Sequence, residues 1–578
     1  MIRKLASYIG EFKKTSIMTP IFILIETICE VIIPLLMAAI VDSGINNKDM
    51  NYIVKLGILM FVISIISLTC GALAARFGAY ASAGFARNLR GAMFETIQDY
   101  SFENIDKYST AGLITRLTTD VNNVQNSYQM ILRTCVRSPL MLIFALIMAI
   151  SINKTLSLVF LGAIIFLGTV LFFIMKNVHP RFKSVFKQYD DLNASVQENL
   201  TGIRTVKSAV REDFEINKFK KASDNVKNKF IDAEKLIVLN GPVMQFSMYT
   251  CMLLISWLGA KMIVSDTMTT GQLMSLFTYA TQILMSLMMI SMVFVMIIMS
   301  KAAGERIMEV LDEESTIKNP QNPIKEVKDG SIAFENVDFS YMKDENKLNL
   351  EKINLEIKSG ETVGIIGGTG SAKSTLVQLI PRLYDVTGGC VKVGGVDVRD
   401  YDTESLRNEV SMVLQKNVLF SGTIKENLRW GNKSASDEEL IDACKKACAH
   451  EFIETFPNGY DTYIEQGGSN VSGGQKQRLC IARALLKKPK ILILDDSTSA
   501  VDTKTDSIIR DALKNDISST TKIIIAQRIS SIEDSDKIIV LDDGKINAIG
   551  THDELKINNN IYREIYESQV KGADEDDK

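Results

Sequence analysis

Histidine and cysteine are scarce in this chain and too irregularly placed for a metal centre. The three histidines stand at positions 179, 450 and 552 of 578 residues, and the eight cysteines are scattered. Cys444 and Cys448 have the spacing of one helix face, but no further cysteine or histidine stands at metal-ligand spacing from them. The sequence therefore predicts buried, reduced thiols rather than a metal site.

A strong charge of either sign is also missing. The 65 Lys and Arg residues are balanced by 68 Asp and Glu residues, which leaves a formal net charge of −3. A nucleic-acid-binding protein needs clustered positive charge, so this balance argues against a nucleic-acid partner. A chain of 578 residues is too long for one hydrophobic core, and at least two domains are expected.

Long apolar runs occur only in the N-terminal part of the chain, and the C-terminal part has the composition of a soluble domain. Six stretches are long enough to cross about 30 Å of hydrocarbon, and they lie near residues 17–41, 54–80, 134–152, 155–176, 238–264 and 273–299. The polar segments 81–133 and 177–237 keep helical periodicity, so the spans are expected to continue as helices beyond the lipid bilayer. These two segments and the N-terminus hold many Lys and Arg, whereas the short connections between the other runs hold few. Because positively charged loops stay in the cytoplasm, both termini are predicted to be cytoplasmic.

Four ionisable residues fall within or next to the apolar runs. Glu26 and Glu30 are four residues apart in the first run, and Arg133 and Arg137 are four apart at the start of the third. Such spacing places each pair on one helix face, and intramembrane charges are functional candidates. Two interpretations remain open. The groups line a central cavity, where they pair or contact substrate, or they are structural ion pairs and arginines that reach the interface.

A phosphate-binding loop is the clearest local motif. Residues 367–375 read Gly-Gly-Thr-Gly-Ser-Ala-Lys-Ser-Thr, between an apolar strand and an expected helix from Lys373. Backbone N–H groups and a helix N-terminus in this context bind phosphates. We expect Lys373 to bind the β- and γ-phosphates of ATP, Ser374 to bind Mg²⁺ and Thr375 to contact the α-phosphate. Ala372 stands where the loop usually has glycine, and its methyl group restricts the backbone there.

Two further motifs accompany the loop: Val-Ser-Gly-Gly-Gln at 471–475 and Ile-Leu-Ile-Leu-Asp-Asp at 491–496. Together with the six apolar runs they resemble the exporter-type half-transporters of the ATP-binding cassette (ABC) family, over nearly the whole chain. The resemblance implies a multidomain fold, with an all-α six-helix transmembrane domain followed by an α/β P-loop cassette. The expected boundaries are 1–310 for the membrane domain, 311–329 for a linker, 330–570 for the cassette and 571–578 for an acidic tail. Segments 112–120 and 197–207 resemble the coupling segments that dock on cassettes.

The resemblance also implies roles for cassette residues outside the phosphate loop. Tyr341 corresponds to the aromatic residue that stacks on adenine, Gln415 to the Q-loop glutamine and Asp502 to the D-loop. Asp495 ends an apolar strand and is expected to hold Mg²⁺ together with Ser374 and Gln415. The predicted ATP-binding residues are Tyr341, Gly367, Gly370, Ser371, Ala372, Lys373, Ser374, Thr375 and Gln415.

Two catalytic positions depart from the family pattern. The family places Glu after the Walker-B Asp and His at the switch loop, where this chain has Asp496 and Gln527. Hydrolysis needs a carboxylate that orients and deprotonates water. Asp is one methylene shorter than Glu, and misplacement by about 1 Å can lower a rate on the order of 10²-fold. Gln527 follows the expected strand Lys-Ile-Ile-Ile-Ala at 522–526. It can donate a hydrogen bond but cannot carry positive charge, and none of the three histidines follows this strand.

The signature motif, in contrast, is nearly complete. It comprises Val471, Ser472, Gly473, Gly474 and Gln475. The resemblance implies that this motif clamps the γ-phosphate held by the opposite cassette, with Ser472 and the amides of Gly473 and Gly474 supplying the contacts. The altered residues thus belong to this chain's own site, and the signature completes a partner's site. The sequence predicts the degenerate-site subunit of a bacterial heterodimeric, multidrug-type ABC exporter in the cytoplasmic membrane. Its partner would be a second, catalytically complete half-transporter, and its substrate a small hydrophobic drug-like molecule or lipid.

Three alternatives remain open at this stage. The chain could form a homodimer in which Asp496 is a slow base. It could be an ATP-gated channel or regulatory subunit that moves no substrate uphill. It could also import a ligand with the exporter fold, because the sequence does not reveal the direction of transport.

Overall fold

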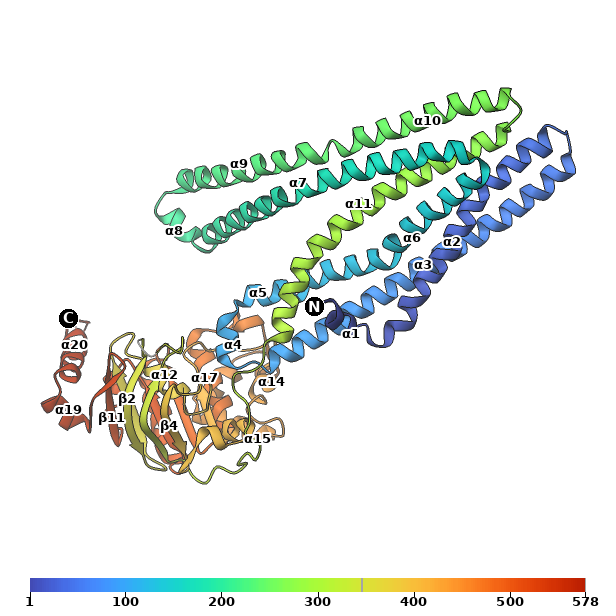
Figure 1. Cartoon of the computed structure of the whole chain (residues 1–578). Coiled ribbons are helices and arrows are strands. Elements are labelled where there is room, and N and C mark those ends of the chain that lie inside the picture. Colours follow the sequence, from blue (N-terminus) through green and yellow to red (C-terminus); the bar gives the residue numbers. More distant parts are fainter. Residues whose placement is uncertain (345–346, 577–578) are drawn as a thin grey trace. The chain divides into compact units, whose positions relative to one another are not determined.

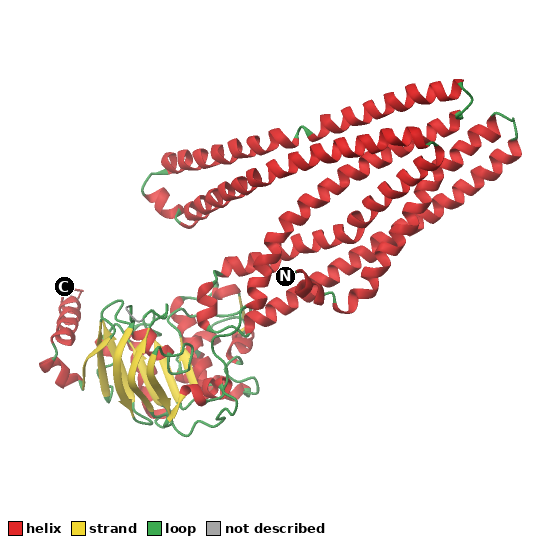
Figure 2. Ribbon diagram, viewed as in Figure 1, coloured by secondary structure: helices red, strands yellow, loops and turns green. Residues whose placement is uncertain are grey.

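The computed structural model describes residues 1–344 and 347–576 (Figure 1). The chain divides into two compact units, one formed by Met1–Gln98 and Ser109–Glu313, the other by Asp99–Tyr108 and Glu314–Lys578. Figure 2 shows that the first unit consists of helices and that the strands lie in the second. The predicted order of a helical membrane domain and an α/β domain is therefore confirmed.

Six helical stretches of the first unit are long and apolar enough to span a membrane: Gly10–Ile45, Met50–Gln98, Thr110–Ile152, Lys154–Thr201, Glu212–Val264 and Thr270–Phe294. The helices of this unit are α1 (Ile2–Ser7), α2 (Lys13–Ala39), α3 (Met50–Gln98), α5 (Thr110–Thr115), α6 (Val121–Ile152), α7 (Lys154–Thr201), α8 (Ile203–Ser208), α9 (Glu212–Ile237), α10 (Asn240–Val264) and α11 (Thr270–Asp312). Helix α3 has 49 residues, which at about 1.5 Å per residue is more than twice the thickness of the hydrocarbon. A helix of this length agrees with the prediction that the second span continues beyond the bilayer.

Side chains that cap helices define the short connections between spans. Asn153 precedes α7, and its Oδ1 accepts hydrogen bonds from the backbone N–H groups of Thr155 (3.0 Å) and Leu156 (3.1 Å). Thr269 and Gln272 form a capping box at the start of α11. These caps satisfy N–H groups that have no partner within the helix, so α7 and α11 each begin at a defined residue.

The second unit contains three sheets. Strand order is β2-β1-β4-β5 in the first, β12-β11-β3-β10-β9-β6 in the second and β7-β8 in the third. The strands are β1 (Ile332–Phe339), β2 (Leu350–Ile357), β3 (Thr362–Gly367), β4 (Gly388–Val393), β5 (Val396–Asp397), β6 (Val410–Val413), β7 (Gly422–Thr423), β8 (Tyr463–Ile464), β9 (Ile491–Asp495), β10 (Thr521–Ile525), β11 (Lys537–Asp542) and β12 (Lys545–Gly550). The helices are α4 (Phe102–Lys107), α12 (Lys373–Gln378), α13 (Thr403–Glu409), α14 (Ile424–Leu428), α15 (Asp437–Lys446), α16 (His450–Glu454), α17 (Gly473–Leu485), α18 (Thr503–Asp516), α19 (His552–Asn558) and α20 (Asn560–Asp576).

The six-stranded sheet is parallel except for its edge strand β12. Every residue of β9 and β10 is buried, as expected for central parallel strands that are covered on both faces. Their isoleucines and leucines contribute to two hydrophobic clusters of the cassette. The buried strands β9 and β10 are thus the rigid base from which the loops of the site extend.

The unit boundary lies close to the predicted one but differs in detail. Helix α11 continues to Asp312, and the chain from Glu314 onward belongs to the cassette unit. Ile324 forms a β-bridge with Tyr401, so part of the expected linker is tied to the cassette. The backbone of the acidic tail is helical as far as Asp576, and residues 577 and 578 lie outside the described chain.

The cysteines are free, and the predicted burial of their thiols holds for only some of them. Cys70, Cys251, Cys444 and Cys480 are buried, whereas Cys135 is exposed. Cys448 follows the end of α15 in a left-handed conformation (φ 52°), so it does not share a helix face with Cys444 as its spacing predicted.

The short segment 99–108 belongs to the cassette unit although it lies far from the cassette in sequence. Its helix α4 begins with a capping box of Ser101 and Asn104. The Ser101 hydroxyl lies 2.7 Å from that of Thr316, and Asn104 Nδ2 donates to the carbonyl of Glu314 (3.1 Å). These hydrogen bonds join α4 to the beginning of the cassette segment.

Aromatic and ionic contacts complete the docking of α4. Tyr384 donates a hydrogen bond to Asp106 Oδ2 (2.5 Å), and its ring packs against Phe102 at 6.0 Å between centroids. Lys343 forms an ion pair with Glu103 (2.7 Å). The sequence placed the first docking segment at 112–120. Those residues form α5 and a π-helical turn of the first unit, and their docking on a cassette stays a prediction. Segment 197–207 also lies in the first unit, where α8 buries none of its residues.

The Tyr384–Asp106 hydrogen bond predicts the effect of Tyr384→Phe. The ring packing remains, but the segment loses a hydrogen bond to a charged group, so opening of α4 becomes easier. Amide hydrogen exchange in residues 99–108 is expected to rise about three- to tenfold, measured by mass spectrometry on the full-length protein. Tyr463→Phe, at an exposed tyrosine of the cassette, is the matched control. Unchanged exchange in 99–108 contradicts the assigned contact.

Candidate functional site

The predicted nucleotide motifs meet at one edge of the six-stranded sheet. Ile525 at the end of β10 pairs with Ile365 of β3 on one side and with Asp495 of β9 on the other. The phosphate loop, the Asp495–Asp496 pair and the Gln527 loop therefore leave three neighbouring parallel strands at their carboxyl ends. This is the edge where open α/β sheets bind ligands.

The phosphate loop has a backbone conformation that glycine makes possible. A Cβ at Gly367 would lie 2.1 Å from the carbonyl oxygen of Leu541, and Gly370 has a φ of +88°. Lys373 Nζ donates to the carbonyls of Gly367 (2.9 Å) and Gly368 (2.7 Å), so its ammonium group lies over the loop. Burial lowers the pKa of Lys373, and the nearby carboxylates of Asp495 and Asp496 oppose this effect.

The remaining residues predicted for the loop lie around Lys373. Ser371 is buried, and its Oγ lies within 3.3 Å of Lys373 Nζ. Thr375, in the first turn of α12, is also buried. The Lys373 ammonium group and the backbone N–H groups at the start of α12 both donate hydrogen bonds to anionic oxygens, so the loop fits a phosphate chain.

Ala372 is the strained residue of this loop. It is the N-cap of α12 and has a left-handed conformation, with φ 66° and ψ 26°. For a residue with a Cβ this conformation costs about 1–2 kcal/mol. The sequence predicted a restricted backbone at this position, and the structure shows the loop keeping the conformation that glycine would adopt.

Oxygen ligands suited to Mg²⁺ lie beside the loop. Ser374 Oγ donates to Asp495 Oδ1 at 3.0 Å, and Asp495 is only 3% exposed. Burial raises the pKa of Asp495, whereas the bond from Ser374 and the charge of Lys373 lower it. Gln415 is exposed two residues after β6, which pairs with β9. Hydroxyl, carboxylate and amide oxygens are hard ligands of the type that Mg²⁺ prefers, so this donor set fits the ion.

Tyr341 lies next to the phosphate loop, as predicted for an adenine-stacking residue. Its hydroxyl is 3.1 Å from Thr375 Oγ1 and 3.3 Å from Gln378 Oε1, both on α12. Its ring packs edge-on against Tyr384 at 5.1 Å between centroids. Burial raises the pKa of the Tyr341 hydroxyl, so the phenol stays protonated as a hydrogen-bond donor. The stacking role itself stays a prediction.

The two altered catalytic residues are hydrogen-bonded to each other. Gln527 Nε2 donates to Asp496 Oδ2 at 2.8 Å. Asp496 has a left-handed backbone (φ 49°), and its N–H donates to the carbonyl of Ile525 (3.0 Å). One oxygen of the carboxylate is therefore engaged by an amide of the protein. The sequence placed both residues at the site but could not show that they contact each other.

The signature motif forms the start of α17. Ser472 and Gln475 make a capping box, with 2.9 Å from Ser472 N to Gln475 Oε1 and 3.2 Å from Gln475 N to Ser472 Oγ. Gly474 is required because a Cβ there would lie 2.8 Å from the carbonyl oxygen of Ala500. Val471 is buried in the core, whereas Ser472 and Gly473 are exposed. The motif thus presents a helix N-terminus to the surface.

The D-loop packs against the signature helix. Gln477 of α17 accepts a hydrogen bond from Ala500 N (3.1 Å) and contacts Ser499 Oγ (3.4 Å). Asp502 caps α18 by accepting from Thr505 N (2.9 Å), and this bond lowers the pKa of Asp502. The D-loop and the signature motif therefore form one surface.

Of the four charged residues predicted within or next to the apolar runs, Glu26, Glu30 and Arg137 form a cluster. Arg137 of α6 binds Glu30 of α2 through Nη2, at 2.6 and 2.8 Å, and its Nη1 lies 3.2 Å from Glu26. The two glutamates on one helix face thus share one guanidinium. This arrangement is the ion pair between helices that the spacing allowed.

Two glycines of α3, which the sequence analysis missed, make room for these side chains. A Cβ at Gly71 would lie 3.0 Å from Glu26 Oε1, and one at Gly78 would lie 3.3 Å from Arg133 Cδ. The glycines are seven residues apart and therefore lie on one helix face. That spacing was the available signal, but it gains meaning only when α3 is known to face α2 and α6.

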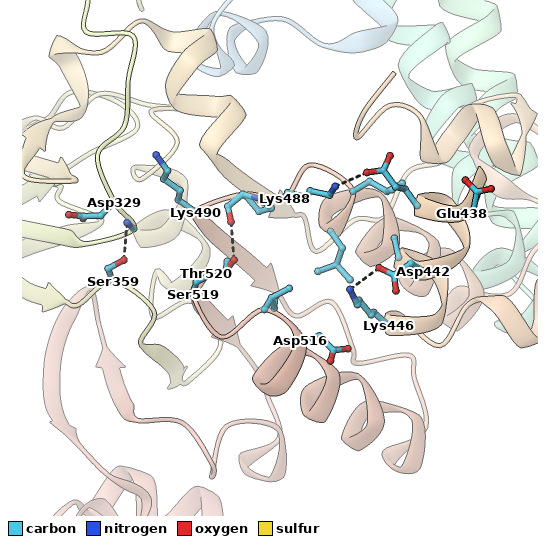
Figure 3. Close-up of a pocket in the computed structure, with 17 residues that line it drawn as sticks. Asp329, Ser359, Glu438, Asp442, Lys446, Lys488, Lys490, Asp516, Ser519 and Thr520 are labelled. Atoms are coloured by element: carbon cyan, nitrogen blue, oxygen red, sulfur yellow. Dashed lines mark hydrogen bonds and ion pairs between the residues drawn. The ribbon is translucent and has the colours of Figure 1, made fainter. Parts of the chain in front are cut away.

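A cavity of about 720 Å³ in the cassette does not belong to this site (Figure 3). It lies before the first residues of β9 and β10, at Lys490 and Thr520, whereas the motifs lie at the carboxyl ends. Two of its three lysines form ion pairs, Lys446 with Asp442 (2.7 Å) and Lys488 with Glu439 (2.6 Å), and the third, Lys490, donates to the carbonyl of Val327. The cavity contains none of the predicted nucleotide-binding residues.

Comparison with known proteins agrees with these motifs. Residues 16–287 match the model of the ABC transporter transmembrane region, and residues 350–499 match the ABC transporter model. The chain is 37% identical to an uncharacterized ABC transporter ATP-binding protein, YfiB, of Bacillus subtilis, over 98% of each chain. It is 35% identical to a similarly described protein, Mb1304c, of Mycobacterium bovis, over 99% of each. The structure of a bacterial Atm1-family ABC exporter with ATP bound is similar with a TM-score of 0.84 and 25% identity, over 96% of this chain and 99% of that one.

The left-handed Ala372 predicts that Ala372→Gly stabilises the cassette. Glycine relieves strain at φ 66°, and the net gain is about 1 kcal/mol after its larger unfolded-state entropy is counted. The thermal unfolding midpoint in the presence of ATP should rise. Ala512→Gly, within α18, is the control and should lower stability by about 1 kcal/mol. Equal losses from both variants contradict strain at Ala372.

The shared guanidinium predicts that Arg137→Met destabilises the membrane unit more than Glu26→Gln. Without Arg137 two carboxylates face each other in a poorly hydrated environment, whereas Glu26→Gln leaves the Arg137–Glu30 pair intact. Thermal unfolding of the full-length protein in detergent measures both. A smaller loss for Arg137→Met than for Glu26→Gln contradicts the cluster.

Proposed function

The chain belongs to the ABC transporter family, and we propose that it is the degenerate-site subunit of a heterodimeric exporter. It is an exporter-type half-transporter whose cassette couples ATP hydrolysis to transport across a membrane. In the proposed assembly this chain's own phosphate loop holds ATP with little hydrolysis. A second, catalytically complete half-transporter hydrolyses the other ATP.

The hydrogen bond between Gln527 and Asp496 carries this proposal. A general base needs a free carboxylate oxygen within hydrogen-bond reach of the attacking water. The Asp496 side chain is one methylene shorter than glutamate, and Gln527 engages one of its oxygens. A neutral amide also supplies no positive charge to stabilise the transition state. These three features lower the rate of hydrolysis without removing a ligand for ATP.

The contacts around the phosphate loop support nucleotide binding at this chain's own site. Lys373 and the loop backbone would hold the phosphates, Ser374 and Asp495 would hold Mg²⁺, and Tyr341 would stack on adenine. Bound Mg²⁺ would neutralise phosphate charge, and Ser374 and Asp495, already 3.0 Å apart, are prepared to share it. This site is therefore suited to retain ATP at the interface of two cassettes.

The intact signature motif supports a partner that differs from this chain. Ser472 and Gly473 are exposed at the start of α17, where they would contact the γ-phosphate held by the opposite cassette. In a homodimer both sites would contain the Asp496–Gln527 pair. A partner with glutamate and histidine at these positions would give the signature of this chain a competent site to complete.

The proposed substrate is a small hydrophobic or amphipathic molecule, such as a drug-like compound or a lipid. Family resemblance supports this class. The Arg137–Glu26–Glu30 cluster supports a structural role for these charges, because groups that pair with one another have fewer free hydrogen-bonding positions for a ligand. We further propose that the transporter lies in a bacterial cytoplasmic membrane with both termini in the cytoplasm.

Hydrolysis by the purified assembly carrying Asp496→Asn tests the proposal. Its ATPase rate should stay within about twofold of the unmodified assembly, whereas loss of a working base lowers a rate on the order of 10²-fold or more. Steady-state phosphate release measures both. A collapse of the rate would show that Asp496 is the working base and would contradict the proposed degenerate-site heterodimer.

The reverse substitution is the matched control. Asp496→Glu combined with Gln527→His restores the family pattern at this chain's site, and a second competent site should raise turnover by up to about twofold. An increase of tenfold or more would mean that this site alone had limited the assembly, which contradicts a competent partner.

A further inference from the structure

The C-terminal helix α20 presents one face to the cassette core, and that face ends in a polar residue. Tyr562, Ile565, Tyr566 and Gln569 follow the i, i+3, i+4, i+7 spacing of one helix face. Tyr562 is fully buried, and Ile565 and Tyr566 pack against the core. An apolar residue would continue this face at 569, so the glutamine needs another explanation.

The side-chain amide of Gln569 binds the switch loop at two points. Its Oε1 accepts from the N–H of Ile529 (2.9 Å), and its Nε2 donates to the carbonyl of Gln527 (2.8 Å). An amide that donates and accepts in this way replaces a neighbouring peptide group and fixes both ends of the turn around Arg528. Strand β10 ends at Ile525, and its strand pairing ends with it. Beyond that point, Gln569 of α20 supplies hydrogen bonds to the backbone of the loop.

The same loop is held from a second side. Ser531 Oγ donates to Asp506 Oδ2 (3.0 Å) on α18, the helix that Asp502 caps. The backbone of Gln527 is fixed by Gln569, while the Gln527 side chain reaches Asp496. The position of the amide at the nucleotide site therefore depends on the docking of α20.

The base of α20 is anchored firmly enough to transmit this constraint. His552 Nδ1 lies 2.7 Å from the Tyr562 hydroxyl, and Asn559 Oδ1 accepts from Tyr562 N (2.8 Å). Lys556 lies over the ring of Tyr566, with 4.1 Å from Nζ to the centroid. These contacts fix two turns of α20 below Gln569.

We propose that Gln569 is a positioning residue of the nucleotide site. It holds the switch loop so that Gln527 remains on Asp496, and in this way α20 sets how long ATP stays bound at this chain's own site. The inference rests on the proposed function only in that this site holds ATP. Residues far from the phosphate loop in sequence thereby control nucleotide residence.

Two variants of the full-length chain in the assembled transporter test this role. Gln569→Met keeps the length and loses both hydrogen bonds, and Gln569→Glu keeps the acceptor for Ile529 but loses the donor to Gln527. The probe is Mg²⁺ with 8-azido-ATP labelled at the α-phosphate, chased with unlabelled ATP and then photolysed, so that the label retained on each chain is resolved by electrophoresis. Both variants should lose label from this chain about three- to tenfold faster than the unmodified protein.

A positioning role is separated from a merely structural one by two further readouts. ATP affinity measured without Mg²⁺, which reports the phosphate loop, should change less than about twofold, and the unfolding midpoint should shift by less than about 2 °C. Glu564→Gln, a carboxylate–amide exchange on the exposed side of α20, is the control and should leave retention unchanged. Retention unchanged in both Gln569 variants, or a loss of Mg²⁺-free affinity or stability as large as the loss of retention, overturns the proposal.

A second label keeps this test independent of the proposed function. Probe labelled at the γ-phosphate reports hydrolysis at this chain's site, because hydrolysis removes the γ-label before the α-label leaves. Faster loss of the γ-label in the unmodified protein would contradict the proposed function, whereas the effect of Gln569 is read from the α-label alone.

Discussion

The function of the cassette depends on the alignment of three parallel strands, β3, β10 and β9. Their pairing places the phosphate loop, the Asp495–Asp496 pair and the Gln527 loop at one edge, within hydrogen-bond reach of one another. The strands are buried on both faces, so small changes in the loops do not move this base. Lys373, Asp495, Asp496 and Gln527 therefore all lie at or just beyond these three carboxyl ends.

At that edge, the residues proposed to bind nucleotide and the residues at the catalytic positions differ in their contacts. Lys373, Ser374 and Asp495 form a compact set of charges and donors around the loop. Asp496 and Gln527 satisfy each other instead. In the proposed heterodimer, retention of ATP would need the first set and turnover the second, so this chain would support closure of the dimer with little hydrolysis at its own site. Its exposed signature would contribute to hydrolysis at the other site.

The sequence predicted what local patterns encode and missed what packing decides. Apolar run length located the six spans, and the order of strand, glycine-rich loop and helix located the phosphate site. The contact of segment 99–108 with the cassette was not predicted, because the hydrogen bonds of Ser101 and Asn104 to the chain near residue 315 have no local signal. The sharing of Arg137 by two glutamates depends on helix packing. The bonds of Gln569 join residues 40 positions apart or more and could not be read from periodicity.

The most direct test of the account is the composition of the native assembly. The transporter would be purified from its native membrane through an affinity tag on this chain and weighed by native mass spectrometry. The account predicts one copy of this 64.3 kDa chain together with one copy of a different ABC half-transporter. A complex of two copies of this chain that hydrolyses ATP at the full rate of the native preparation would contradict it.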